Sequence, residues 1–216
     1  FHTLLYFLLD GSTRFSHDGG WLSQPSPGMK GQDIQIKSNA KGKDNDMPKK
    51  PKVAIVMGSD SDFPVMEGCL NILKEFDVET SVAICSAHRT PDRAAEIARN
   101  AESEGCDLII GAAGKAAHLP GVLAAYTVLP VIGIPIKSST LDGLDSLLSI
   151  VQMPQGVPVA TVAINGSGNA ALLAIQILGG TYPDLREKMR EYKKKMAEAV
   201  EAKNQQLQAR LRGAEQ

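Results

Sequence analysis

Five short stretches of small, hydroxyl-bearing or charged residues occur along the chain, and each follows an apolar run. They are GSDSD (58–62), SAHRT (86–90), GAAGKAAH (111–118), KSST (137–140) and NGSGN (165–169). Two of the four histidines, His88 and His118, fall within them. Glycines and hydroxyls at the start of a helix, where backbone N–H groups are free, favour binding of an anion such as a phosphate.

The stretch SAHRT places a proton donor beside a permanent cation. Arg89 can bind a phosphate or a carboxylate through two parallel hydrogen bonds, a geometry that lysine cannot offer. His88 is the candidate for proton transfer, since an imidazole gives or takes a proton near neutral pH. The alternative is an exposed loop histidine without a role, and the residues alone leave both interpretations open.

Two other stretches also allow two interpretations. In GSDSD, the polar side chains could bind a phosphate or a sugar, or Ser61 or Asp62 could cap the following helix, and the two roles are compatible. In GAAGKAAHLPG, small residues could line a tight pocket for a small flat group, or could permit close packing of helix on sheet. Neither the G-x-G-x-x-G pattern after the first apolar run nor a G-x-x-x-x-G-K-[ST] pattern is present, which disfavours dinucleotide and ATP binding.

The apolar patterning indicates how these stretches are positioned. Continuous apolar runs predict buried strands at 52–58, 81–85, 107–114, 130–136 and 158–164. Helix-like spacing or composition between and after them predicts helices at about 63–76, 91–104, 119–125, 141–151 and 169–178. This alternation is typical of a three-layer α/β fold, a doubly wound parallel sheet of flavodoxin or Rossmann type. Because ligands bind at the carboxyl ends of such strands, we expect the polar stretches to meet at one edge.

The chain divides into three predicted segments. Residues 1–52 are expected to be a disordered leader or upstream sequence, because residues 12–52 show no sustained periodicity. The first ten residues, FHTLLYFLLD, lack the features of a signal peptide and are too short to span a bilayer. Residues 53–180 form the predicted catalytic domain. Residues 181–216 are predicted to form an amphipathic helix that packs on the core or on a neighbouring subunit, which favours a homo-oligomer but leaves a monomer with a folded-back helix open. The helix carries an apolar stripe of Leu185, Met189, Tyr192, Met196 and Val200.

Composition excludes several classes of partner. The chain has 216 residues, 43% of them apolar, and its 23 basic and 24 acidic residues nearly cancel, so we expect no nucleic acid and no membrane surface as a partner. The three cysteines, Cys69, Cys85 and Cys106, show no C-x-x-C spacing. This argues against a zinc site and a disulfide framework, and favours reduced thiols in a cytoplasmic protein.

From Val53 to Leu178 the sequence resembles the class I 5-(carboxyamino)imidazole ribonucleotide mutase (PurE) family of purine biosynthesis. The resemblance lies in VAIVMGSDSD, SAHRTPD, AAHLPG, LPVIGIPI, GLDSLLSIVQMPQGVPVATVAI and NAALLAIQIL, in this order. It implies a cytoplasmic, nucleotide-binding isomerase of IMP biosynthesis, commonly an octamer. Such an enzyme moves a carboxylate from the exocyclic nitrogen of an aminoimidazole ribonucleotide to ring carbon 4, without metal or other cofactor.

The resemblance also implies roles for individual residues. His88 matches the family's acid and base. The ribose and phosphate are expected at Ser59, Ser61, Asp62, Ser86 and Arg89. The loop that holds the transferred carboxyl group is expected at Ala113, Gly114, His118 and Leu119. The family is thought to release carbon dioxide, keep it in a small dry pocket and let ring carbon 4 attack it, which is mainly catalysis by positioning.

Lys115 departs from the family pattern, in which this position is usually glycine or another small or apolar residue. A cation beside the loop that holds the carboxylate could strengthen ground-state binding or obstruct closure, but we expect its flexible stem to point to solvent. Two other functions remain open from the sequence. A related carboxylase uses free carbon dioxide, but its members typically replace the arginine after the histidine and lack H-L-P-G, so Arg89 and HLPG favour the mutase. A non-catalytic nucleotide-binding module could share the same fold.

Overall fold

The structure is a computed structural model that describes residues 13–15, 21–23 and 49–213, and the chain falls into two units, Phe1–Met47 and Pro48–Gln216. In the first unit, β1 (Thr13–Phe15) pairs with β2 (Trp21–Ser23) in an antiparallel ladder. The predicted disorder of 1–52 falls largely on residues outside the described ranges, so for these it stays a prediction.

The second unit is built on a parallel five-stranded sheet. Its strands are β3 (Lys52–Met57), β4 (Glu79–Ile84), β5 (Leu108–Gly114), β6 (Val131–Ile136) and β7 (Ala160–Thr161). The spatial order is β4-β3-β5-β6-β7, and all neighbours are parallel. This is the flavodoxin-like order, in which the direction of winding reverses between β3 and β5. It confirms the predicted doubly wound sheet.

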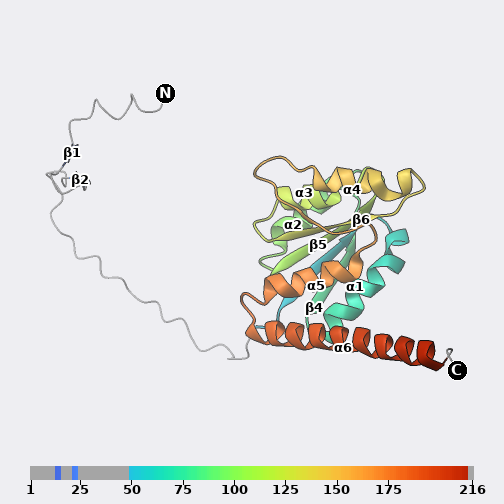
Figure 1. Ribbon diagram of the computed structural model, residues 1–216. Helices are drawn as coiled ribbons and strands as arrows, with labels where there is room; N and C mark the ends of the chain where they lie inside the picture. Colours follow the sequence, from blue (N-terminus) through green and yellow to red (C-terminus); the bar gives the residue numbers. More distant parts are fainter. Residues whose placement is uncertain (1–12, 16–20, 24–48, 214–216) are drawn as a thin grey trace. The chain divides into compact units, whose positions relative to one another are not determined.

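Helices cover both faces of this sheet (Figure 1). One face carries α1 (Phe63–Glu75), α5 (Ser167–Leu178) and α6 (Pro183–Gly213), and the other carries α2 (Pro91–Asn100), α3 (Leu119–Ala125) and α4 (Leu144–Val151). Side chains of a strand point alternately to its two faces. Accordingly, Ile110 and Ala112 of β5 pack with α1 and α5, while Ile109 and Ala113 pack with the opposite helices.

Several element boundaries differ from those predicted. The helix expected to reach 104 ends at Asn100, because the chain turns through Gly105 at a φ of 83° and the Cys106 N–H bonds back to the Ala101 carbonyl. The helix expected from 141 begins at Leu144, after a 3-10 turn (Leu141–Gly143) whose residues all have positive φ. The last strand keeps two residues because it has a partner on one side only and follows Pro158, which lacks an N–H.

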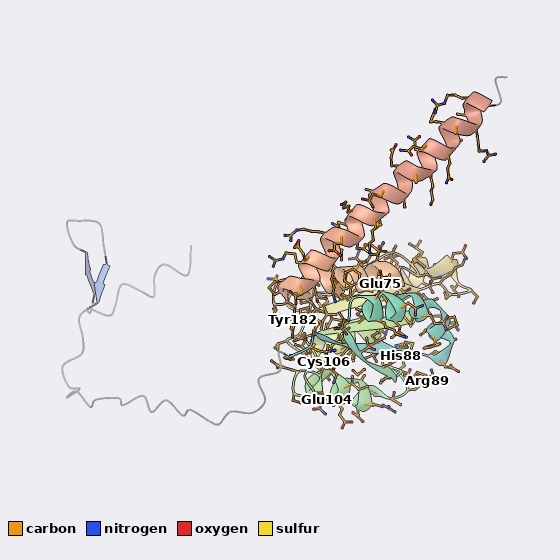
Figure 2. The ribbon with its side chains drawn as sticks, turned by 90° about the horizontal axis from the view of Figure 1, so that it is seen from below. Glu75, His88, Arg89, Glu104, Cys106 and Tyr182 are labelled. Carbon is orange, nitrogen blue, oxygen red and sulfur yellow. The ribbon has the colours of Figure 1, made fainter. Side chains whose placement is uncertain are left out.

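Helix α6 packs on the rest of the second unit through its first turns only. Leu185 and Met189 are buried in the core, and the Tyr192 ring lies 5.7 Å from that of Phe76. Farther along the same stripe, Met196 is 54% exposed. The helix projects beyond the sheet and its other helices (Figure 2). None of the helices in the described part of the chain has the length and hydropathy that crossing a membrane requires.

Candidate active site

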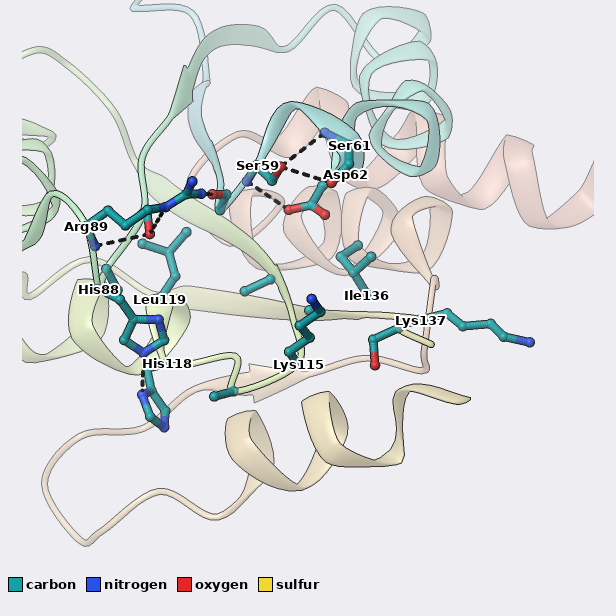
Figure 3. Close-up of a pocket in the computed structure, with 17 residues that line it drawn as sticks. Ser59, Ser61, Asp62, His88, Arg89, Lys115, His118, Leu119, Ile136 and Lys137 are labelled. Atoms are coloured by element: carbon teal, nitrogen blue, oxygen red, sulfur yellow. Dashed lines mark hydrogen bonds between the residues drawn. The ribbon is translucent and has the colours of Figure 1, made fainter. Parts of the chain in front are cut away.

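A cavity of about 670 Å³ lies at the carboxyl edge of the sheet, between the loops that follow β3, β4, β5 and β6 (Figure 3). All ten predicted site residues line it: Ser59, Ser61, Asp62, Ser86, His88, Arg89, Ala113, Gly114, His118 and Leu119. The stretch NGSGN, expected at the same edge, is not part of the lining. It supports the lining instead, since the Asn165 side-chain oxygen accepts the backbone N–H of Lys137 at 2.8 Å.

Several further residues line the cavity that were not predicted as site residues. These are Gly58, Ala87, Lys115, Ala116, Ile136, Lys137 and Ser138. Ser138 and Lys137 belong to KSST, which the parallel topology places at the same edge, but lysine and serine are too common in surface loops for a role to follow from the sequence. Ile136 belongs to an apolar strand, and its position at the strand end was the one available signal.

The loop after β3 is held by its own polar groups. The Ser59 hydroxyl accepts the Ser61 N–H at 3.3 Å, and the Asp62 carboxylate accepts the Ser59 N–H at 3.1 Å, which forms a capping box around the turn Asp60–Asp62. Asp62 stands at the N-cap position of α1, as one of the two predicted candidates, but its side chain makes no capping bond to that helix, and Ser59 caps the turn before it. Ser61 remains exposed at the cavity.

The two carboxyl groups of this loop have opposite pKa shifts. Asp62 is only 6% exposed, and burial raises its pKa although the Ser59 N–H bond acts in the other direction. Asp60 is exposed, and the hydrogen bond from the Ser59 hydroxyl lowers its pKa. Asp62 is the one that lines the cavity. A buried carboxyl group with spare acceptor capacity suits a ligand hydroxyl, which can donate to it.

In the loop after β4, the Arg89 side chain is bonded both to its own loop and to the loop after β3. Thr90 closes the turn, because its N–H and hydroxyl both donate to the Ser86 carbonyl, at 2.8 and 2.9 Å. The Arg89 Nε donates to the Ser86 hydroxyl at 3.3 Å, and its Nη2 reaches the Gly58 carbonyl at 3.5 Å. A guanidinium has five N–H donors, so most of them remain for a ligand.

The two histidines of the cavity bond to each other. His88 Nε2 lies 2.8 Å from His118 Nδ1, and the rings meet edge to face with centroids 4.9 Å apart. One ring must donate and the other accept, so the pair shares one proton between these nitrogens. This leaves His88 Nδ1 available to a ligand. The pair could not be predicted from the sequence, because the two residues are thirty positions apart and follow β4 and β5, which are not neighbours.

The small residues of the loop after β5 serve both predicted purposes, at different positions. A Cβ on Gly111 would lie 3.2 Å from the Pro120 Cα, so this glycine permits close packing of β5 on α3. Ala113 and Gly114 instead line the cavity. The small residues thus bring α3, with Leu119 and the preceding His118, close to the end of the strand.

Other reactive side chains lie away from the cavity. The three cysteines are free and buried, and burial raises the pKa of Cys69 to about 12. No group of three or more His, Cys, Asp or Glu side chains within the described ranges is arranged to hold a metal ion.

Comparison with known proteins gives related sequences. Over 159 residues the chain is 60% identical to the N5-carboxyaminoimidazole ribonucleotide mutase of Pyrococcus horikoshii, a match that covers 74% of this chain and 90% of that protein. The mutase of Thermotoga maritima is 58% identical over 158 residues, covering 73% and 92%. The phosphoribosylaminoimidazole carboxylase of Saccharomyces cerevisiae is 54% identical over 177 residues, which cover 82% of this chain but 31% of that longer protein.

Solved structures show the same fold. Treponema denticola PurE superposes with a TM-score of 0.63 at 30% identity, and the match covers 70% of this chain and 94% of that one. A PurE2 variant of the same organism superposes with a TM-score of 0.66 at 29% identity, and the match covers 73% of this chain and 98% of that one. The family model described as AIR carboxylase matches residues 52–199, which include the whole sheet and the first part of α6. The chain therefore belongs to the AIR carboxylase family.

Proposed function

We propose that this chain is a 5-(carboxyamino)imidazole ribonucleotide mutase of de novo purine (IMP) biosynthesis. It moves a carboxylate from the exocyclic nitrogen to ring carbon 4 and gives 5-amino-4-carboxyimidazole ribonucleotide. The observation that carries the proposal is one cavity shared by an imidazole, a guanidinium and a loop of small residues. Its volume, about 670 Å³, is in the range of small-molecule sites.

The ribose and phosphate bind on the side formed by the loops after β3 and β4. Arg89 binds the phosphate through the donors that its two internal bonds leave free. The hydroxyls of Ser59, Ser61 and Ser86 add neutral hydrogen bonds. Asp62 accepts a ribose hydroxyl, a role that its burial and spare acceptor capacity support.

The carboxyl group is transferred beside Ala113, Gly114, His118 and Leu119. In the first step the bond between the exocyclic nitrogen and the carboxyl carbon breaks, its electron pair stays on nitrogen, and His88 gives that nitrogen a proton. In the second step ring carbon 4 bonds to carbon dioxide, and the proton of carbon 4 passes to His88. Protons and electrons balance over the two steps, so no other reactant is needed, and holding the fragments together lowers the barrier.

His118 supports His88 in both steps. Because their rings share a hydrogen bond of 2.8 Å, the orientation of His88 is fixed before a ligand binds. The same bond lets His118 accept or return a proton as His88 changes state. His118 thus has a part in proton transfer in addition to its place beside the carboxyl group.

A second candidate is direct carboxylation with free carbon dioxide, which the name of the yeast relative favours. An isotope experiment separates the two. The carboxyamino substrate is converted in the presence of ¹³C-labelled carbon dioxide, and the 4-carboxy product is analysed by mass spectrometry. We expect unlabelled product from the mutase. Product with the label of the dissolved pool would contradict transfer within the cavity.

We further propose that the chain works as a cytoplasmic homo-oligomer, an octamer by resemblance. Helix α4 supports an assembly, because Leu144, Leu148 and Val151 form an apolar stripe that is nearly half exposed, at 47–48%. The free cysteines are consistent with a reducing compartment. Native mass spectrometry tests the assembly: Leu148→Asp is expected to release smaller species, and a monomeric parent chain would contradict the proposal.

A further inference from the structure

Lys115 has a backbone conformation that lysine rarely adopts. It follows Gly114 in the loop after β5, with a φ of 57°. Among the described residues with positive φ that are not glycine, the others are Asp77, Leu141, Asp142 and Asn165. Aspartate and asparagine tolerate this region, whereas a lysine is disfavoured there. Such a residue at a cavity points to a functional role for its side chain.

The charges around the cavity leave Lys115 free to bind a ligand. Three cations and one carboxylate line it: Arg89, Lys115, Lys137 and Asp62. Lys137 pairs with Asp142 at 3.1 Å, and Arg89 makes the two bonds described above. Lys115 has no hydrogen bond and no ion pair with any described residue. In Figure 3 its side chain rises toward the side on which Asp62 lies, whereas Lys137 extends away.

The two cations come from strands on opposite sides of β3. Arg89 follows β4 and Lys115 follows β5, and β3 is the strand between these two. The Arg89 guanidinium reaches back to the Gly58 carbonyl after β3, so the two cations enter one cavity from different loops. A cavity with cations from two loops fits a ligand that carries two anionic groups. A ribonucleotide with a phosphate and a carboxylated ring is such a ligand.

We propose that Lys115 binds the carboxylate of both substrate and product, and that it makes the site selective for carboxylated over decarboxylated ribonucleotides. The proposal rests on the function proposed above. An ammonium group on a flexible stem acts as a point charge without a fixed direction. It can therefore follow the carboxylate as this group moves from the exocyclic nitrogen to ring carbon 4.

This role has a kinetic consequence. The carboxylate is charged in the substrate and in the product, but carbon dioxide between the two steps is neutral. A cation that binds the charged group stabilises both ends of the reaction more than its middle. Such binding lowers KM without raising kcat. Loss of the Lys115 charge should therefore weaken substrate binding and leave kcat unchanged or raised.

Calorimetry and kinetics on the full chain test the proposal with Lys115→Met, which removes the charge but keeps most of the length of the side chain. We expect its affinity for 5-amino-4-carboxyimidazole ribonucleotide to fall roughly tenfold, the effect of losing one hydrogen bond to a charged group. Its affinity for 5-aminoimidazole ribonucleotide should stay within about twofold of the parent, which is roughly a third of the free energy of a tenfold change. KM should rise as the affinity for the carboxylated ribonucleotide falls, and Lys115→Arg should restore both.

Lys50→Met is the matched control, because it removes another exposed lysine charge, one that is paired with Asp77 and does not line the cavity. We expect parent affinities for this variant. Equal losses of affinity for the two ribonucleotides in Lys115→Met, or no loss for either, would overturn the proposal. Calorimetry measures the difference between the two affinities without turnover. The role of Lys115 is therefore tested independently of the mutase activity, which the isotope experiment tests.

Discussion

The two ends of the sheet each contain a carboxyl group beside a loop, and their pKa values are shifted in opposite directions. At the carboxyl edge, burial raises the pKa of Asp62. At the amino edge, burial acts on Asp107 in the same sense, but hydrogen bonds outweigh it and the pKa is lowered. The donors to Asp107 are the Lys49 ammonium at 2.6 Å, the Lys52 N–H at 3.0 Å and the Tyr182 hydroxyl at 3.1 Å.

This difference separates a structural cluster from a binding site. The bonds to Asp107 join the start of β3, the start of β5 and the segment before α6, so its carboxylate is used by the fold itself. The groups around Asp62 satisfy one another only in part and leave donors and acceptors toward a cavity. Substitutions at the carboxyl edge should therefore affect turnover and binding, and substitutions at the amino edge should affect stability.

The largest expected effect is that of His88→Asn. Loss of the acid and base should lower kcat about 10²- to 10⁴-fold. Ligand binding should survive, since asparagine keeps a polar side chain of smaller size. Steady-state kinetics and calorimetry with the 4-carboxy ribonucleotide measure the two quantities. Turnover close to that of the parent would show that the acid and base lie elsewhere.

Arg89→Ala should have the next largest effect. Loss of a charge-assisted contact to phosphate should weaken ribonucleotide binding roughly 10- to 100-fold. The affinity for the nucleoside, which lacks the phosphate, should be comparable in variant and parent. Titration calorimetry with both ligands measures this difference. Equal losses for nucleotide and nucleoside would contradict the phosphate role.

At the amino edge, Asp107→Asn should lower the free energy of unfolding at neutral pH by about 1 kcal/mol, as expected for charged hydrogen bonds near the surface. The pKa of Asp107 is lowered in the folded chain, so its contribution is present above the usual carboxyl pKa and lost as pH falls through the lowered value. Urea unfolding at several pH values measures this dependence, which the variant should lack.

Asp77→Asn is the control for this prediction. Asp77 pairs with Lys50 at 3.4 Å, but its side chain is 69% exposed, and asparagine tolerates the φ of 61° at this position. We expect almost no change in stability. If the two variants lost the same stability, the bonds to Asp107 would have no special importance.

Asp62→Asn should have a small effect on stability, opposite in sign to that of Asp107→Asn. The raised pKa means that the ionised carboxyl destabilises the folded chain at neutral pH, and that this penalty disappears as pH falls below the usual carboxyl pKa. An amide can still accept the Ser59 N–H. The variant should thus be as stable as the parent or more stable by under about 1 kcal/mol, while its KM rises. Thermal unfolding with a parallel KM measurement tests both, and a clear loss of stability would contradict this account.

The fold and the four loops that line the cavity could be predicted from the sequence because they depend on periodicity and topology, although NGSGN, expected with them, is not part of the lining. Apolar runs such as 107–114 predict buried strands of a parallel sheet, and parallel strands bring the loops that follow them to one edge. The side chains in those loops were therefore expected together before any contact was known. The roles of these residues stay predictions that the experiments above test.

Details that depend on contacts between loops could not be predicted. The bond between His88 and His118 depends on the relative positions of two strand ends. The use of Ser59 as the cap of the turn depends on the turn geometry, because Ser59 and Ser61 have the same capping propensity. The early end of α2 has the same origin, because Gly105 permits a turn whose starting point only the hydrogen bonds define.

The uneven packing of α6 implies a gradient of local unfolding along one continuous helix. Its 31 residues extend roughly 46 Å at 1.5 Å per residue, but contacts with the core are concentrated near Leu185, Met189 and Tyr192. Isolated helical turns are marginally stable in water, so backbone amides beyond Val200 should exchange with solvent deuterium far faster than those at the start. The helix would then fray inward from its carboxyl end and stop where Tyr192 meets Phe76.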